Sequence, residues 1–150
     1  MIRLDVIEIA EPSSDALDAL KAYAAVSDSG NDSLLMMVLR TAFDKVQRAA
    51  DVALLDGRFR LCVDEHLRSV SVYMGGKVES VTNGNGLPVS HIQNGRRVWL
   101  GTDEYVEVEF TTTANPAGYA RYMPVVCQYA TALYDGQDEK VLNGILKQCL

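Results

Sequence analysis

The stretch EVEFTTTANPAGYARYMPVVCQYATALYDGQDE, from Glu107 to Glu139, holds the change of secondary structure that decides the fold of this 150-residue chain. It begins with apolar and polar residues in alternation, which is typical of a β-strand with one buried face. The alternation breaks at Asn115-Pro116 and Gly118, residue types that favour turns. From Pro124 the stretch becomes apolar and predicts a helix that carries two tyrosines. We therefore expect a strand, a short Pro/Gly turn and a tyrosine-bearing helix.

The residues that precede this stretch predict an antiparallel β-meander. Apolar residues alternate with polar ones from Arg58 to Val63 and again from Ser69 to Met74. Gly75-Gly76 and Asn94-Gly95 are pairs that favour two-residue hairpin turns. The last strand is expected over residues 105–111. Short strands joined by tight turns indicate a mostly antiparallel sheet.

Helical patterns come earlier in the chain, after a weakly alternating segment over residues 1–11 that predicts a short strand or an arm. Ser13 or Ser14 can cap a first helix, which is expected to end near Ser27–Gly30. A long helix follows, capped by Asn31, Asp32 or Ser33 and ended by Asp56-Gly57. Its predicted apolar face consists of Leu35, Leu39, Ala42, Val46, Ala49 and Ala53, and the polar residues that lie mostly off this face are Asp44, Lys45, Gln47, Arg48 and Asp51.

A final amphipathic segment is predicted over residues 137–150. Its apolar stripe consists of Val141, Leu142, Ile145, Leu146 and Cys149. Helices on both sides of a run of strands indicate the α+β class. We expect one domain over residues 1–150, with N-terminal helices, a central antiparallel β-meander and C-terminal helices, and with a mostly helical bundle into which the strands are inserted.

Charge and cysteine content exclude several classes of protein. The net charge is -6, whereas a protein that grips nucleic acid through phosphate contacts needs clustered Lys and Arg. The three cysteines, Cys62, Cys127 and Cys149, show no spacing typical of a zinc site or a disulfide framework. The first fourteen residues lack the apolar core of a signal peptide, and no stretch approaches the ~20 apolar residues of a membrane span. We expect a soluble chain with reduced thiols, made in the cytoplasm, without a membrane partner.

No pattern in the sequence predicts a catalytic, cofactor-binding or metal-binding site. His66 and His91 have no second ligand at a helical or hairpin spacing, so both are expected to be polar residues in turns. The nucleophile motif GxSxG is absent. Asn83–Gly86 does not open a helix and is unsuited to cradle a phosphate. The sequence therefore favours a protein that is not an enzyme and has no cofactor.

The tyrosines near the C-terminus allow three interpretations. They are Tyr119, Tyr122, Tyr129 and Tyr134. A stacking platform for bases would need a basic groove, which the scattered Lys and Arg residues do not predict. Core packing and anchoring of a protein interface remain, because tyrosine suits positions that are dry at one end and wet at the other.

The arrangement resembles the head–tail connector (adaptor or head-completion) proteins of tailed bacteriophages and prophages, a family also associated with DNA packaging. Its members begin with a helix that ends in a short acidic loop, as Leu17–Tyr23 and Asp28–Asp32 do here. A long helix follows, matched by LRTAFDKVQRAADVALLDG at Leu39–Gly57. A strand of the form L-x-S-V-x-V-Y is matched at Leu67–Tyr73.

The C-terminal part of the resemblance is the most specific. It combines a strand, a Gly-Tyr turn, a proline and a helix with an Ala/Tyr pattern. Val106–Thr113, Gly118-Tyr119, Pro124 and Gln128–Tyr134 match these features in turn.

The resemblance implies a structural protein of the virion, located at the head–tail junction and made in the bacterial host. Such proteins form a homo-oligomeric ring under the portal, with roughly twelvefold symmetry, as a closed series of head-to-tail contacts. The implied partners are other copies of the chain, the portal protein, a tail-completion protein and DNA that passes without sequence-specific binding. A negative charge fits such a channel, because it does not trap a passing polyanion.

Two other interpretations stay open. One is a different α+β interaction module without catalytic activity, such as another phage tail-completion protein or a regulatory domain. The other is an enzyme whose site cannot be paired from sequence. For the connector interpretation, the candidate interface residues are Arg96, Arg97, the four tyrosines Tyr119, Tyr122, Tyr129 and Tyr134, and the stripe residues Val141, Leu142, Ile145 and Leu146. The stripe must dock on either the chain's own long helix or another subunit, since so short a helix is marginal alone. Connector function favours the portal or another subunit.

Overall fold

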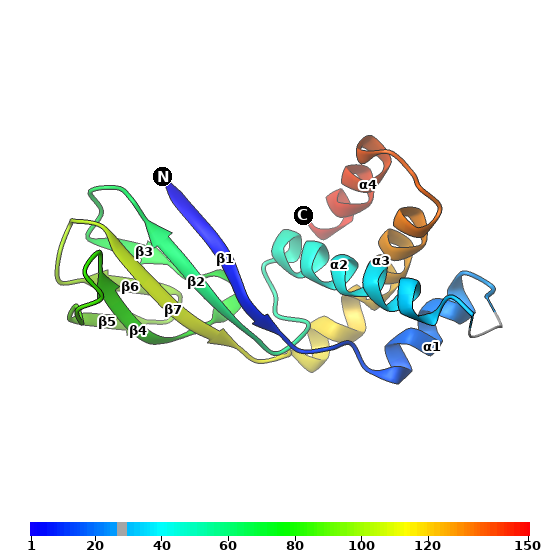
Figure 1. Ribbon diagram of the computed structural model, residues 1–150, viewed down its shortest axis with the longest axis horizontal. Helices are drawn as coiled ribbons and strands as arrows, with labels where there is room; N and C mark the ends of the chain where they lie inside the picture. The colour runs from blue at the N-terminus through cyan, green and yellow to red at the C-terminus, as the bar shows by residue number, and fades with distance from the viewer. Residues whose placement is uncertain (27–29) are drawn as a thin grey trace. The chain divides into compact units, whose positions relative to one another are not determined.

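Helices and strands are both abundant in the computed structural model, which describes residues 1–26 and 30–150 (Figure 1). Helix accounts for 42% and strand for 28%, so the α+β class is confirmed and the expectation of a mostly helical bundle is wrong. In chain order the elements are β1 (Ile2–Ile9), α1 (Ser14–Tyr23), α2 (Asp32–Ala50), β2 (Gly57–Val63), β3 (Ser69–Ser71), β4 (Lys77–Asn83), β5 (His91–Asn94), β6 (Arg97–Leu100), β7 (Val106–Thr112), α3 (Pro116–Tyr134) and α4 (Glu139–Leu146).

Backbone contacts divide the chain into two compact units. The strand unit comprises Met1–Ala10 and Asp56–Thr113, and the helical unit comprises Glu11–Leu55 and Ala114–Leu150. Each unit is therefore built from two separate segments of the sequence. That residues 1–150 behave as a single domain stays a prediction.

The strand unit contains two antiparallel sheets rather than one meander. The first has the strand order β1-β2-β7-β4 and the second has the order β3-β6-β5. The N-terminal segment is thus a strand of a sheet, and it pairs with β2 from Ile2 opposite Val63 to Ile9 opposite Gly57. On the buried face of the first sheet, Phe59 and Phe110 are directly opposite each other, with ring centroids 5.5 Å apart.

The expected hairpin at Gly75-Gly76 is wrong, because β3 and β4 belong to different sheets. Met74 and Gly75 both have left-handed backbone angles, with φ of 58° and 65°. A side chain at position 76 would collide with Phe110, whose ring lies 2.3 Å from where a Cβ would be. The two glycines therefore turn the chain from one sheet to the other across Phe110. Gln93 on β5 links the sheets, since its side-chain oxygen accepts from the Val78 N–H at 2.9 Å and its amide donates to the Gly76 carbonyl at 2.8 Å.

The hairpin between β5 and β6 is confirmed, but its loop begins one residue later than the predicted Asn94-Gly95, because Asn94 belongs to β5. Asn94 lies opposite Arg97, which leaves Gly95 and Arg96 as the two-residue loop. Gly95 has a φ of 61°, a conformation that an L side chain rarely adopts. The turn thus follows from glycine chemistry that is visible in the sequence.

In the helical unit, α1 begins as expected and α2 ends earlier than expected. Ser13 caps α1, and its hydroxyl accepts from the Ala16 N–H at 3.1 Å. The helix ends at Tyr23, and most of the predicted end near Ser27–Gly30 lies outside the described residues. α2 ends at Ala50, because Asp51 adopts a left-handed conformation with a φ of 54°. The predicted end at Asp56-Gly57 is wrong, and Gly57 instead begins β2.

Gln47 was predicted to lie off the apolar face of α2, but it is fully buried. Its side-chain oxygen accepts from the backbone N–H groups of Leu54 and Leu55 at 3.2 and 3.4 Å. The segment after α2 is therefore held against the helix by a buried amide. Ala53 is buried within this segment rather than in the helix.

The predicted turn between β7 and the C-terminal helix is in fact the start of that helix. α3 begins at Pro116, where a proline at the first helical position loses no hydrogen bond. The Asn115 side chain caps it by accepting from the Gly118 N–H at 2.9 Å. Gly118 lies within the first turn and Pro124 lies inside the helix. Asn, Pro and Gly were interpreted as turn residues, although Asn followed by Pro is also typical of a helix N-terminus.

Candidate functional site

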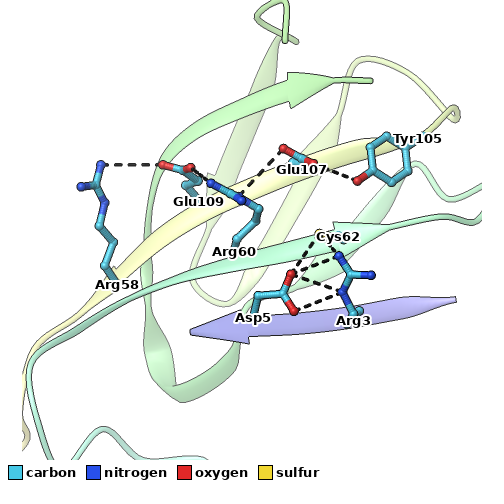
Figure 2. Close-up of polar contacts among 8 residues, drawn as sticks. All are labelled: Arg3, Asp5, Arg58, Arg60, Cys62, Tyr105, Glu107 and Glu109. Carbon is cyan, nitrogen blue, oxygen red and sulfur yellow. Dashed lines mark hydrogen bonds and ion pairs between the residues drawn. The ribbon is translucent and has the colours of Figure 1, made fainter. Parts of the chain in front are cut away.

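Charged and hydroxyl side chains gather on one face of the first sheet, and we call this group the charged face. Its members are Arg3, Asp5, Arg58, Arg60, Cys62, Tyr105, Glu107 and Glu109 (Figure 2). They come from β1, from β2, and from β7 with the residue that precedes it. Side chains alternate between the two faces of a strand, so the residues between them are the apolar ones that fill the core.

Arg60 lies between two carboxylates of β7. Its Nη2 donates to Glu109 Oε1 at 2.9 Å, and its Nε is 3.9 Å from Glu107 Oε2 (Figure 2). Arg58 Nη2 approaches the other Glu109 oxygen at 3.7 Å. The hydrogen bond to Glu109 is the main cause that raises the pKa of Arg60 above its ordinary value. The guanidinium is therefore held in its charged form between the two carboxylates.

Glu107 has a second partner, Tyr105. The Tyr105 hydroxyl donates to Glu107 Oε1 at 2.9 Å. This bond, followed by burial, raises the pKa of Tyr105 to about 12. Tyr105 is therefore a neutral hydrogen-bond donor at neutral pH, and it is unsuited to act as a base.

On β1, Arg3 and Asp5 form an ion pair within one strand. Arg3 Nε is 3.1 Å from Asp5 Oδ1, and Arg3 Nη2 is 3.1 Å from Asp5 Oδ2. The thiol of Cys62 on the neighbouring strand lies beside both, with Sγ 3.6 Å from Arg3 Nη2 and 3.7 Å from Asp5 Oδ2. The pair is well exposed, since the side chains are 60% and 40% accessible.

The charged face is electrically balanced, with three guanidinium groups and three carboxylates. Every carboxylate has a positive or hydroxyl partner. Within residues 1–26 and 30–150, no three His, Cys, Asp or Glu side chains come together as metal ligands would. The geometry supports strand pairing and a solvated polar surface.

The four tyrosines predicted as interface candidates all lie on α3, but they differ in exposure. Tyr122 and Tyr129 are buried, with 8% and 5% of their surface accessible. Tyr119 is half-buried and stacks on Phe43 of α2 at 5.8 Å between ring centroids. Tyr134 is half-buried, and its hydroxyl accepts from Asn31 Nδ2 at 3.0 Å. Core packing accounts for Tyr122 and Tyr129, and an interface role for any of the four stays a prediction.

The C-terminal stripe docks on the chain's own helices. Asp138 caps α4 through the Val141 N–H at 3.0 Å. α4 packs against α3 and α2; Ile145 is buried there, while Leu142 and Leu146 are half-buried. Val141 is 42% exposed and borders a groove of about 350 Å³ together with Tyr23 and Gln128. The sequence left two docking surfaces open, the chain's own long helix and another subunit. The structure shows the stripe packed within its own chain, against α3 as well as the long helix α2. Contact with another subunit stays a prediction.

The remaining candidates are exposed. Arg96 and Arg97 lie at the β5–β6 hairpin, and Arg97 Nη1 donates to Ser69 Oγ at 3.3 Å. These two arginines belong to the strand unit, whereas the tyrosines and the stripe belong to the helical unit. His66 and His91 are also exposed. His66 lies in the bend between β2 and β3, as expected, but the expectation of a turn is wrong for His91, which begins β5. A ring nitrogen of each lies near a backbone carbonyl oxygen, that of Asp103 and that of Val89 respectively.

Sequence reasoning missed the charged face. The signal for it was present in two pairs of like charges, each with a spacing of two residues. Arg58 and Arg60 carry positive charge on one strand, and Glu107 and Glu109 carry negative charge on another. The two strands are almost fifty residues apart in the chain, so only their pairing makes the complementarity visible.

No protein-family model and no curated protein sequence matches this chain. Solved structures do share its fold. A chain in the neck of an empty gene transfer agent (GTA) particle, computed with C6 symmetry, aligns with a TM-score of 0.61 at 16% identity, over 98% of this chain and 94% of that one. A chain in the virion of a native GTA particle aligns with a TM-score of 0.57 at 16% identity, over 91% and 86%. A chain in the neck of a native GTA particle, computed with C12 symmetry, aligns with a TM-score of 0.51 at 16% identity, over 95% and 94%.

Proposed function

We propose that this chain is a structural protein of a phage-like particle, located at the neck and serving to join head and tail. The observation that carries the proposal is the similarity of fold to a neck protein of a gene transfer agent, which extends over nearly the whole of both chains. A shared fold does not by itself imply a shared function. Here the head–tail connector family was indicated independently by the order of motifs along the sequence.

In the finer form of the proposal, the copies form a ring under the portal. One side of the ring contacts the portal, and the other side contacts a tail-completion protein. The necks of gene transfer agent particles, computed with C6 and C12 symmetry, supply the precedent for a cyclic assembly. A ring of this kind needs heterologous contacts, in which two different patches of each copy meet. The net charge of -6 suits a channel through which DNA passes without being held.

The chemistry of the described residues is consistent with this role. The charged face is a balanced set of ion pairs and hydrogen bonds. Each helix within residues 1–26 and 30–150 is too short or too polar to cross a bilayer. We assign no catalytic activity and no cofactor to the chain.

Electron microscopy of the purified full-length chain, alone and mixed with its cognate portal protein, tests the proposal. We expect rings of the chain seated on the portal. A chain that stays dispersed and leaves the portal bare would contradict the proposal. A chain that binds the tail-completion protein but never the portal would favour the alternative of a tail-completion or other α+β interaction module.

A matched pair of variants tests the interface at α4. Val141 is exposed on the stripe and Asn143 is exposed nearby on the same helix. Val141→Glu should prevent seating on the portal, because it places a charge in an apolar contact, whereas Asn143→Glu adds the same charge and should have no effect. If both variants bind the portal equally well, the proposal of a ring is retained, but α4 does not form the contact with the portal.

A further inference from the structure

The outer edge of β1 is open. β1 is the terminal strand of its sheet, and no strand within the described residues pairs with its outer side. An open edge is a template for another strand, and proteins commonly protect it with Lys, Pro or a covering element. The segment Ile2-Arg3-Leu4-Asp5-Val6 contains neither Lys nor Pro.

The hydrogen bonds to β2 show which backbone groups point outward. Met1 and Asp64 exchange two backbone hydrogen bonds, each 2.8 Å long. Because bonded and non-bonded pairs alternate along an antiparallel ladder, Arg3 and Asp5 also direct their N–H and C=O groups toward β2. The backbone groups of Ile2, Leu4 and Val6 therefore face the open edge.

The same three residues carry apolar side chains that the chain itself leaves partly uncovered. Ile2 is 41% exposed and Val6 is 42% exposed, and Leu4 is half-buried. They lie opposite Val63, Leu61 and Phe59 of β2, all of which are buried. An added strand would thus extend both the hydrogen-bond ladder and the apolar face of the sheet.

We propose that the occupant of this edge is β1 of a second copy of the chain, paired antiparallel about Leu4 to form a two-fold dimer. In this register Leu4 meets Leu4, and Ile2 meets Val6 of the other copy. These are the residues whose backbone groups face outward, so the pairs can form hydrogen bonds. Arg3 then lies opposite Asp5 in a non-bonded pair, where side chains are closest.

The segment Ile2–Val6 is self-complementary, because its apolar residues are placed symmetrically about Leu4 while Arg3 and Asp5, on either side of Leu4, carry opposite charges. This selects the register. Sliding the strands by two residues in one direction would place Arg3 opposite Arg3, and in the other direction Asp5 opposite Asp5. Like charges directly opposite each other destabilise a pair of strands. A slip by one residue would place outward-facing backbone groups opposite groups already bonded to β2. Only the register centred on Leu4 matches both charges and hydrogen bonds.

The dimer should be weak and limited to these five residues. The pairing of β1 with β2 is irregular between Val6 and Glu8, so a regular edge does not continue beyond Val6. Five residues a side bury well under the roughly 1,200 Å² of a stable interface. An isologous pair closes with two copies and cannot propagate. This surface is therefore distinct from the contacts of a ring, and the inference stands whether or not the chain is a neck protein.

Sedimentation velocity of the full-length chain over a wide range of concentrations tests the proposal through charge reversal. Arg3→Asp places carboxylates opposite each other in the homodimer, and Asp5→Arg places guanidinium groups opposite each other. Because symmetry repeats each pair twice, we expect either variant to weaken dimerisation by roughly tenfold or more. An equimolar mixture of the two variants restores opposite charges at every pair, so we expect dimers to return, now containing one copy of each.

The doubly substituted chain, Arg3→Asp with Asp5→Arg, is the matched control. It reverses both charges but keeps opposite charges at positions 3 and 5, and it should dimerise about as well as the original chain. Circular dichroism and thermal unfolding establish that every variant is folded. Recovery in the mixture cannot come from improved folding, since each copy keeps its own substitution.

Isotope-filtered nuclear magnetic resonance on mixed labelled and unlabelled chains gives a direct reading of register. Close Hα–Hα contacts are expected between Arg3 of one copy and Asp5 of the other, because non-bonded antiparallel pairs bring these protons together. A chain that is monomeric at all concentrations overturns the proposal. A dimer that neither charge reversal weakens, or that shows contacts in another register, overturns it as well.

Discussion

Gln47 and Asn115 are polar residues whose side-chain oxygens hold backbone next to a helix end. Gln47 is fully buried, and its side-chain oxygen accepts a hydrogen bond from the Leu54 N–H, in the segment that follows α2. The Asn115 side-chain oxygen accepts a hydrogen bond from the Gly118 N–H and so caps the start of α3. The Gln47 oxygen is buried, so the loss of its donor would be costly, and this contact holds the segment after α2 in place. The exposed Asn115 side chain acts as an ordinary helix cap.

Gly118 is required by a close approach, and this predicts the effect of replacing it. A Cβ at position 118 would lie 2.5 Å from Val52 Cγ1. Gly118→Ala should destabilise the protein by about 1–2 kcal/mol, since the strain of overpacking exceeds the gain in helix propensity. Urea unfolding measures the difference in the free energy of unfolding.

Gly144 is the matched control, because it also lies in a helix but no atom lies within 4 Å of where its Cβ would be. Gly144→Ala should stabilise the protein by about 0.5–1 kcal/mol. Equal stabilisation by both substitutions would show that Val52 moves aside without cost.

Tyr105 should titrate late. Its pKa is raised from 10.0 to about 12, first by the hydrogen bond to Glu107 and then by burial. Since the folded-state pKa is above the unfolded value, the stability contributed by this hydroxyl is complete below pH 10 and is lost as the pH rises toward 12. The difference in phenolate absorbance between the original chain and Tyr105→Phe should have its midpoint near 12.

Glu107→Gln provides the control for this titration. The amide keeps an acceptor oxygen but removes the negative charge that opposes phenolate formation, so the midpoint of Tyr105 should move down toward 10. A midpoint near 10 in the original chain would show that the Tyr105–Glu107 hydrogen bond does not persist in solution.

At the scale of elements, α4 has one buried and one exposed side. Ile145 faces α3 and α2 and is buried, whereas Val141 is 42% exposed. Ile145→Ala should therefore lower the free energy of unfolding by about 2–4 kcal/mol. Val141→Ala should change it by no more than about 0.5 kcal/mol. Thermal and urea unfolding of the two variants measure this contrast.

The same contrast bears on the role of the C-terminal segment. If Ile145→Ala is as stable as the original chain, α4 is not docked on its own unit in solution and the whole stripe is available to a partner. The expected loss of stability would instead leave only the exposed part of the stripe, with Val141, for contact with another subunit.

At the scale of the whole molecule, charge predicts the behaviour toward DNA. The chain carries 14 Lys and Arg residues against 20 Asp and Glu residues. We expect no measurable binding of duplex DNA at physiological salt, as judged by fluorescence anisotropy with a labelled duplex, because binding requires several clustered phosphate contacts. Tight binding that falls steeply with salt would contradict this and would direct attention to Arg96 and Arg97, the one adjacent pair of basic residues that the strand unit exposes at its β5–β6 hairpin.

Local patterns determined most of the secondary structure from sequence alone. Ser13 as a cap, the alternation through Phe59–Val63, the Asn94-Gly95 hairpin and the amphipathic α4 depend on neighbours within a few residues, and all are present in the structure. The composition and the order of motifs also indicated the α+β class. These features are legible because capping, turn geometry and alternating burial are short-range effects.

Tertiary structure decided what depends on distant residues. The passage of Gly76 across Phe110 and the division of the strands into two sheets follow from pairing and packing between segments far apart in the chain. The charged face has the same origin, since Arg60 meets Glu109 only when β2 and β7 are adjacent. A periodic pattern shows which face of an element is apolar, but the partner of that face is chosen by long-range contacts, and these are what the folded structure alone reveals.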